Sequence, residues 1–185
     1  NDVLNFTGNI TDAGGLKSAN ITYNMSGILT KVNFTLSGTS AQVSNVTRIE
    51  TEGGSVINFT MYATDVSNNV KQNSTLITVA DATTPVVNTT FNTTSPVIND
   101  VINFTGNITD NVALLSANIT YNISGILTKI NFTFGPNIAA AQISNVTQLA
   151  CTETCTINFT MYATDTSSNV KQNSTLITVA DVTPP

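Results

Sequence analysis

The sequence predicts an all-β protein: two tandem antiparallel β-sandwich domains joined by an extended linker rich in Pro, Thr and Asn. The first observation is a long internal repeat, because INFTMYATDVSNNVKQNSTLITVAD at 57–81 recurs at 157–181 with only two substitutions. The second is the alternation of apolar and polar residues within each copy, which is typical of a half-buried strand. The third is a supply of Gly, Ser, Asn and Asp turns without helical periodicity, which favours a sandwich.

The first element of each repeat is NDVLNFTGNITD at 1–12, which recurs as NDVINFTGNITD at 99–110. Alternation places Leu4, Phe6 and Ile10 on one face and the Asn and Thr residues on the other. This pattern predicts a strand with an apolar inner face and a polar outer face.

The next element is SANITYNMSGILTKVNFT at 18–35, which recurs almost unchanged at 116–133. Two alternating runs flank Ser26 and Gly27, and this arrangement predicts a β-hairpin with its turn at those residues.

The two repeats diverge after the hairpin. Residues 36–47 align with 134–147, which are two residues longer, and tolerance of an insertion predicts a surface loop. A second divergent stretch, 48–56 against 148–156, precedes the INFTMYATD strand.

The last strand of the first repeat, expected near 73–80, does not alternate cleanly. If Asn73 and Thr75 face solvent, then so do Ile77 and Val79. The pattern therefore requires either a β-bulge that reverses the faces or a contact of the two apolar residues with another domain or subunit.

The repeat sets the expected domain boundaries. They are 1–81 for the first sandwich, 82–98 for a linker that becomes the first strand of the second repeat, 99–181 for the second sandwich, and 182–185 for the start of another linker. The first repeat has no counterpart of the linker. Either the sequence is an arbitrary cut from a longer array, or a preceding module or subunit donates the missing edge strand by strand addition.

Composition limits the partners. Only 9% of the residues are charged, and the net charge of −5 with six Lys plus Arg argues against nucleic acid or an anionic lipid surface as a partner. No apolar run approaches the roughly 20 residues of a membrane helix. The sequence shows no signal peptide and begins and ends within the repeat pattern, so we expect any signal or anchor to lie outside it.

Catalysis is not expected. The sequence has no His, which removes the commonest general base and metal ligand, and no pair of acidic residues in an expected pocket can be named. We therefore expect neither an enzyme nor a bound organic cofactor.

Three motifs point to a family. ATDVSNNV (63–70), STLITVAD (74–81) and TTPVV (83–87) resemble the bacterial and archaeal immunoglobulin-like cell-surface repeats, including the hyalin-repeat type. The resemblance covers the second half of each repeat well and the first half only in pattern. It implies long extracellular arrays that serve as stalks, adhesin extensions, surface layers or filaments.

The strongest chemical signal is the N-glycosylation sequon Asn-x-Ser/Thr. Of 25 Asn residues, 18 begin a sequon, whereas chance pairing with the Ser and Thr present would give roughly six or seven. The candidate acceptors are Asn5, Asn9, Asn20, Asn24, Asn33, Asn45, Asn58, Asn73, Asn88, Asn92, Asn103, Asn107, Asn118, Asn122, Asn131, Asn145, Asn158 and Asn173.

A strand sequon puts Asn and Ser/Thr on one face and x on the other, and x is mostly apolar here, so we expect the acceptors to face solvent. The alternative is that a strand face rich in Asn and Thr produces the triplet by alternation alone. We favour glycosylation because Asn is depleted in strands and because glycans would hydrate a surface with few charges.

The acidic residues suggest a metal. Asp81, Asp100 and Asp110 lie at strand ends and in the linker, where their oxygen atoms could bind Ca²⁺ at the domain junction. The alternative role for these residues is the capping of turns.

Cys151 and Cys155 enclose CTETC and have no counterpart in the first repeat, which carries Thr51 and Ser55. A separation of four residues permits a disulfide across a tight loop, and a disulfide fits an extracellular setting.

These observations favour a structural repeat module of a heavily N-glycosylated extracellular filament, stalk or surface coat, with neighbouring copies or modules of itself as partners. The alternative is an adhesin module that recognises a glycan or protein through its divergent loops at 36–41, 48–56, 134–141 and 148–156. Tyr62 and Tyr162 would then be the best candidates for stacking against a sugar.

Overall fold

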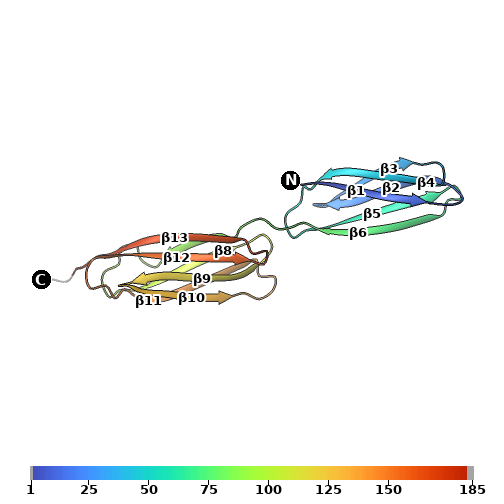
Figure 1. The fold of residues 1–185 in the computed structure, drawn as a ribbon. Helices are drawn as coiled ribbons and strands as arrows, with labels where there is room; N and C mark the ends of the chain where they lie inside the picture. Colours follow the sequence, from blue (N-terminus) through green and yellow to red (C-terminus); the bar gives the residue numbers. More distant parts are fainter. Residues whose placement is uncertain (1, 183–185) are drawn as a thin grey trace. The chain divides into compact units, whose positions relative to one another are not determined.

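A computed structural model describes residues 2–182. The chain divides into two compact units, Asn1–Ala80 and Asp81–Pro185, and each is a sandwich of two antiparallel sheets (Figure 1). Residues 183–185, where the sequence predicts the start of another linker, lie outside the described part. Within the described residues, no helix is long and apolar enough to cross a membrane.

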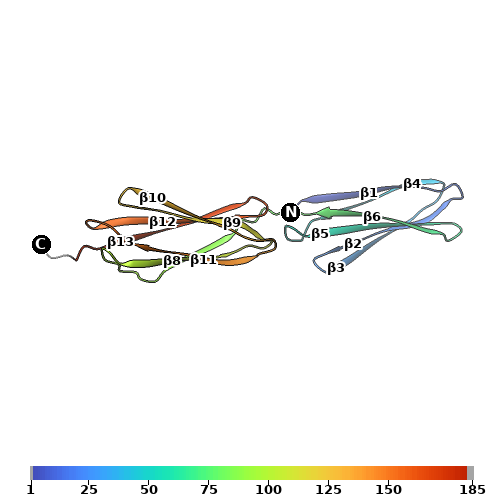
Figure 2. The same ribbon diagram turned by 90° about the horizontal axis from the view of Figure 1, so that it is seen from below.

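Unit 1 contains six strands in two sheets. They are β1 (Val3–Thr11), β2 (Leu16–Met25), β3 (Ile28–Thr35), β4 (Ser40–Arg48), β5 (Val56–Asp65) and β6 (Val70–Thr78). One sheet has the order β3-β2-β5-β6, and the other pairs β1 with β4 alone. Figure 2 shows these two layers.

Unit 2 repeats this arrangement and adds one strand at its start. Its strands are β7 (Val86–Phe91), β8 (Val101–Thr109), β9 (Leu114–Ile123), β10 (Ile126–Thr133), β11 (Ala140–Gln148), β12 (Cys155–Asp165) and β13 (Val170–Val179). The sheets are β10-β9-β12-β13 and β11-β8-β7. The added strand β7 lies within the segment that the sequence predicts to be a linker or first strand.

The predicted hairpin turn is present in both units. Ser26 and Gly27 have φ values of 50° and 82°, and Ser124 and Gly125 have 50° and 84°. Two successive residues with positive φ form the tight turn that matches the twist of antiparallel strands, and glycine adopts such a φ without steric cost.

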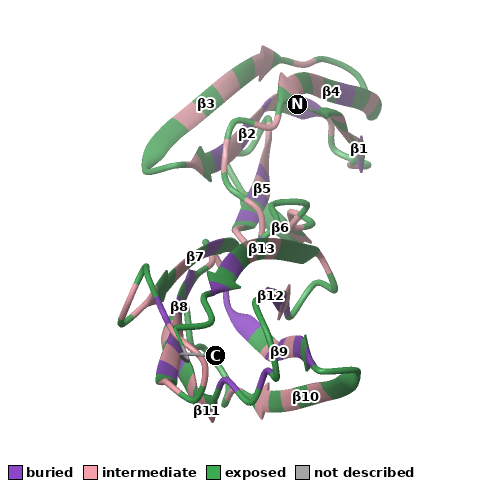
Figure 3. Cartoon of the chain, turned by 90° about the vertical axis from the view of Figure 1, so that its left-hand side faces the viewer, coloured by how far each residue is buried: buried purple, intermediate pink, exposed green. Residues whose placement is uncertain are grey.

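The alternating apolar residues build one core in each unit. Ile21, Ile57 and Phe59 are fully buried in unit 1, and their counterparts Ile119 and Phe159 are fully buried in unit 2. Figure 3 shows this as an alternation of buried and exposed positions along the strands. The period of two in the sequence therefore gives the correct inner face for these strands.

Two sequence-based expectations differ from the structure. Residues 36–47 and 134–147 do not form long loops, because β4 and β11 occupy most of them and pair with β1 and β8. Their alternation is weak because Asn45 and Asn145 occupy inner positions beside the buried Val43 and Ile143.

The last strand of unit 1, β6, also differs from the expectation. Phe59 pairs with Thr75 and Ile57 with Ile77, without a register shift. Because directly opposed residues point to the same side of a sheet, Asn73 and Thr75 share the inner face with Ile77. No bulge reverses the strand, so the inner face of β6 is polar at one end and apolar at the other.

Candidate functional site

Strand β7 closes one side of unit 2 through backbone pairing and side-chain hydrogen bonds. It pairs antiparallel with β8, from Val86 opposite Thr109 to Phe91 opposite Phe104. On its other side it faces β13 (Figure 3). β7 therefore bridges the two sheets of the sandwich.

The polar inner residues of β13 hold β7 in place. The Asn173 side-chain amide donates to the Val87 carbonyl at 3.0 Å, and the Thr89 and Thr175 hydroxyl groups lie 3.0 Å apart. The Asn173 amide also reaches the Thr89 hydroxyl at 3.4 Å. The Asn and Thr that disturb the alternation of the last strand therefore serve as its contacts with β7.

Apolar side chains of β7 complete the core. Val87 is buried, and the Phe91 ring packs 5.0 Å from Phe104 and 5.3 Å from Phe159, measured between ring centroids. Aromatic pairs at these separations contribute about 0.5–1.5 kcal/mol beyond the area that they bury. β7 is thus a core element and not a surface linker.

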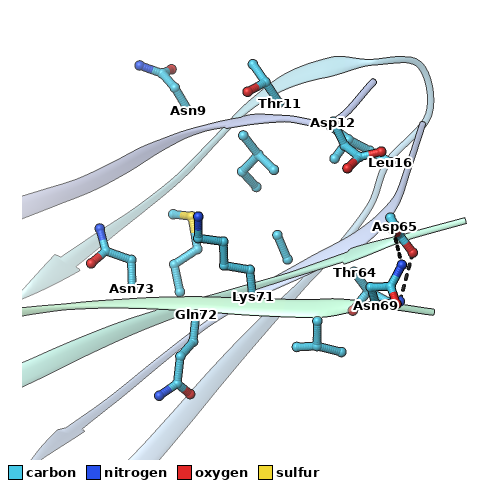
Figure 4. A pocket seen from close by; sticks show the side chains of 14 residues that line it. Asn9, Thr11, Asp12, Leu16, Thr64, Asp65, Asn69, Lys71, Gln72 and Asn73 are labelled. Carbon is cyan, nitrogen blue, oxygen red and sulfur yellow. Dashed lines mark hydrogen bonds between the residues drawn. The ribbon is translucent and has the colours of Figure 1, made fainter. Parts of the chain in front are cut away.

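Unit 1 has an open groove at the position that β7 occupies in unit 2. The groove has a volume of about 600 Å³ and is lined by the end of β1, the end of β5 and the start of β6. Figure 4 shows Lys71 and Asn73 directed from β6 toward Asn9 and Thr11 of β1, whereas Gln72 points away. Asn73 and Thr75 are exposed here, while Asn173 and Thr175 are half-buried.

The open groove lowers the burial of the surrounding core. Phe104 and Ala163 are fully buried in unit 2, but their counterparts Phe6 and Ala63 are only half-buried. Met61 remains 8% exposed, while Met161 is fully buried. Because apolar burial is the main favourable term in folding, unit 1 is expected to be the less stable unit.

Three carboxylates meet beside the start of β7. One oxygen atom each of Asp81, Asp110 and Asp165 lies within 4.8 Å of the others, and Asp165 is fully buried. We call this set the carboxylate cluster. Two ligands on opposite sides of Ca²⁺ are at most about 5 Å apart, since each Ca–O distance is about 2.3–2.6 Å, so the spacing fits this ion.

The hydrogen bonds of the cluster leave two oxygen atoms without partners. The Oδ1 atom of Asp110 accepts from Val112 N and Ala113 N, and the Oδ1 atom of Asp81 accepts from Thr83 N. The Oδ2 atoms of Asp81 and Asp110 are buried and have no hydrogen-bond partner among the described residues. Buried carboxylate oxygen atoms without partners are costly, and a cation would satisfy them.

The cluster differs from the sequence-based metal set in one member. Asp81 and Asp110 come together as that set requires, but Asp100 lies outside the cluster and its Oδ2 atom accepts from Val97 N at 2.9 Å. Asp165 is the residue that sequence reasoning missed. The repeat offered a signal, because A-T-D closes the long strand in both copies.

Unit 1 carries two of the three corresponding carboxylates. Asp12 accepts from Gly14 N and Gly15 N, as Asp110 does from the equivalent residues. The Asn69 side-chain amide donates to Asp65 at 2.7 Å, and this bond, followed by that from Asn69 N, holds the pKa of Asp65 below its usual value. A lowered pKa favours the charged form, so the Asp65 contribution to stability is present above the usual Asp pKa and is lost on acidification.

The sequons fall into two structural groups. Many of the Asn side chains lie on exposed outer positions, among them Asn24, Asn58 and Asn158. Others face inward with the amide nitrogen engaged: the Nδ2 atom of Asn145 donates to the Tyr121 hydroxyl at 3.0 Å, and that of Asn173 donates to β7. The expectation of a solvent-facing acceptor therefore does not hold for these inner positions.

The two cysteines form the expected disulfide, Cys151–Cys155, with their Cα atoms 6.4 Å apart. At the same place in unit 1, the Thr51 hydroxyl donates to the Ser55 hydroxyl at 3.0 Å. A covalent bond in one repeat thus takes the place of a hydrogen bond in the other.

Comparisons with known proteins show no match to a protein-family model and none to a curated protein. Among solved structures, a bacterial ice-binding adhesin of 1.5 MDa matches at 12% identity over 97% of this chain and 57% of that one, with a TM-score of 0.44. A tetra-tandem repeat from the extending region of a large adhesion protein matches at 20% identity over 96% and 49%, with a TM-score of 0.49. Red sea bream transglutaminase matches at 7% identity over 98% and 29%, with a TM-score of 0.37. The chain thus spans about half the length of the first two structures and less than a third of the last.

The first prediction concerns two glycines that lie over a methionine. A Cβ atom at Gly106 would collide with the Sδ and Cε atoms of Met161, and one at Gly8 would collide with the same atoms of Met61. Met61 borders the open groove and can move, whereas Met161 is enclosed beneath β7. We expect Gly106→Ala to lower the free energy of unfolding of unit 2 by about 1–3 kcal/mol, and Gly8→Ala to cost unit 1 clearly less.

Urea denaturation of the two single variants measures the loss in free energy of unfolding in each unit. The unfolding transitions of the two units are followed separately. Equal losses in the two units would show that the groove gives Met61 no freedom to move.

Proposed function

We propose that this chain is a structural repeat module of an N-glycosylated extracellular filament, stalk or surface coat, in which successive sandwiches are completed by an extended strand. The role is mechanical and non-catalytic. The neighbouring modules of the same kind are its partners, and glycans cover its outer faces.

The construction of unit 2 supports this proposal most directly. The segment that follows unit 1 in the sequence becomes strand β7, which pairs with β8 and is held by Asn173 of β13. A connecting segment that is also a core strand leaves little free linker between repeats. Such a construction suits an array that must transmit force, because extension would have to remove β7 from the core.

Glycosylation is supported by the outward sequons. Asn24 and Asn58 are neighbours on the outer face of the four-stranded sheet of unit 1, since Tyr23 pairs with Phe59 directly beside them. The exposed amide nitrogen atoms are open to a glycosyl donor, and sugars there would hydrate the exposed Leu29 and Leu76 of the same face.

We also propose that the carboxylate cluster binds a divalent cation, with Ca²⁺ favoured by its all-oxygen ligands. Asp81, Asp110 and Asp165 would hold the ion, and the partnerless Oδ2 atoms of Asp81 and Asp110 are the observation that favours it. The ion would stiffen the entry of the chain into unit 2, because Asp81 lies just before β7.

The second prediction distinguishes modified from structural Asn residues. Glycopeptide mass spectrometry of native material is expected to find glycans on Asn58 and Asn158, which are exposed on the outer face, and none on Asn145 and Asn173. The inner Asn residues are half-buried, and their amide nitrogen atoms already donate hydrogen bonds that a glycan would break.

Electron cryo-microscopy of the same material tests the assembly, and continuous fibres or a coat are expected. Discrete two-domain particles with unmodified Asn58 and Asn158 would contradict the proposed function and would favour the adhesin alternative.

The third prediction concerns the cation. Ca²⁺ at about ten times its Kd is expected to stabilise unit 2 by about 1.4 kcal/mol, which raises its thermal midpoint by roughly 6 °C. Asp81→Asn and Asp110→Asn should abolish the shift. Asp100→Asn, which alters a carboxylate outside the cluster, is the matched control and should retain it.

Differential scanning calorimetry with and without Ca²⁺ provides this measurement. A shift that persists in Asp81→Asn and Asp110→Asn would place the ion elsewhere, and the absence of any shift in the unaltered chain would refute the cation site.

A further inference from the structure

We infer that the groove of unit 1 binds an extended strand of the β7 sequence type, supplied by a further repeat of the same kind. This inference rests on the proposed function and deepens it, because it names the occupant of the groove, its register and the residues that recognise it.

The groove presents the side chains that hold β7 in unit 2. Asn73 and Thr75 correspond to Asn173 and Thr175, and both are exposed on the inner face. In unit 2 the same residues donate to a β7 carbonyl and share a hydrogen bond with the Thr89 hydroxyl. Polar groups on the inner face of a sandwich are unusual, and an incoming strand accounts for them.

The aromatic core beside the groove also matches that of unit 2. Phe6 and Phe59 stack with their ring centroids 5.1 Å apart, where unit 2 has Phe104 and Phe159 in contact with Phe91. Phe6 is only half-buried, although its counterpart Phe104 is fully buried. An incoming Phe would cover the Phe6 ring and restore the three-ring cluster.

The sheet edge fixes the register. β1 pairs with β4 on one side only, so its other edge is open within the described residues. An open edge strand is a template for pairing with another strand. By analogy with Val86 opposite Thr109 and Phe91 opposite Phe104, the incoming strand runs antiparallel to β1, with its Val opposite Thr11 and its Phe opposite Phe6.

The number of strands identifies the source. The described residues provide two positions for a β7-type strand and one such strand, which already occupies unit 2. Exchange of β7 between two copies would fill one groove and empty another. The occupant therefore comes from a further repeat, and the exchange dimer is an alternative that the experiment tests.

The fourth prediction uses a synthetic peptide as the probe. The peptide has the sequence of residues 81–92, DATTPVVNTTFN, and the protein is the whole 185-residue chain produced without glycans. We expect one peptide to bind per chain. At about 100 times its Kd, it should raise the thermal midpoint of unit 1 by roughly 15 °C and leave that of unit 2 unchanged.

Matched variants locate the binding. Asn73→Ala combined with Thr75→Ala should weaken binding roughly tenfold or more, because the hydrogen bonds to the strand are lost. Leu76→Ala alters the outer face of the same strand and should not change binding. A peptide with Val87→Asp and Phe91→Asp should not bind, because both charges would enter the core.

A chain that carries the strand covalently tests the same binding without a free peptide, whose solubility could limit the measurement. Duplication of residues 81–98 directly before Asn1 should raise the midpoint of unit 1 and abolish peptide binding. Stabilisation by the graft supports the inference even where the free peptide binds weakly.

Three results would overturn the inference: no effect of either the peptide or the graft, equal binding of the two peptides, or a dimer of the unaltered chain that Asn73→Ala with Thr75→Ala disrupts. None of these results bears on glycan occupancy or fibre formation in native material, so failure here is distinguishable from failure of the proposed function.

Discussion

The contact of β7 with β8 and β13 is the interaction on which the closed core of unit 2 depends. It encloses Met161, supplies Phe91 to the aromatic cluster and engages Asn173. The same chain segment carries Asp81 to the other two carboxylates. Core completion and assembly of the carboxylate cluster therefore arise from one event, the placement of residues 81–91 along the sandwich.

Unit 1 shows what the fold is without that contact. It keeps both sheets and its own core around Phe59, so the remaining strands define the sandwich without β7. It also keeps the polar groups that hold β7 in unit 2, and their counterparts Asn73 and Thr75 are exposed, while the Phe6 ring is half-buried. Because the two repeats are nearly identical in sequence, the difference in core burial between the units comes from the presence of β7 and not from different residues along the groove.

Much of the fold follows from the sequence because short-range alternation decides the inner face of most strands. The turn at Ser26 and Gly27 and the core positions Ile57 and Phe59 are examples. Alternation fails for β4 and β13, where Asn45 and Asn173 occupy inner positions and donate to groups distant in sequence. A local pattern cannot reveal such partners.

The carboxylate cluster was less predictable than the fold for the same reason. Asp81 and Asp110 can be chosen by their position at strand ends, but Asp165 joins them only through the pairing of β12 with β9, which lies outside any local window. Asp100 occupies an equally plausible position in the sequence and instead caps a turn. Likewise, composition identifies sequons, whereas the register of β13 decides that Asn173 faces β7.

Hydrogen exchange of the backbone amides tests the central claim most directly, namely that β7 completes unit 2 and that unit 1 lacks an equivalent. The residues to compare are Phe6–Thr11 of β1 with Phe104–Thr109 of β8, which are identical in sequence. The account predicts that the β8 amides exchange at least about tenfold more slowly, since they lie in a central strand of a more stable unit. Equal protection of the two strands would contradict it.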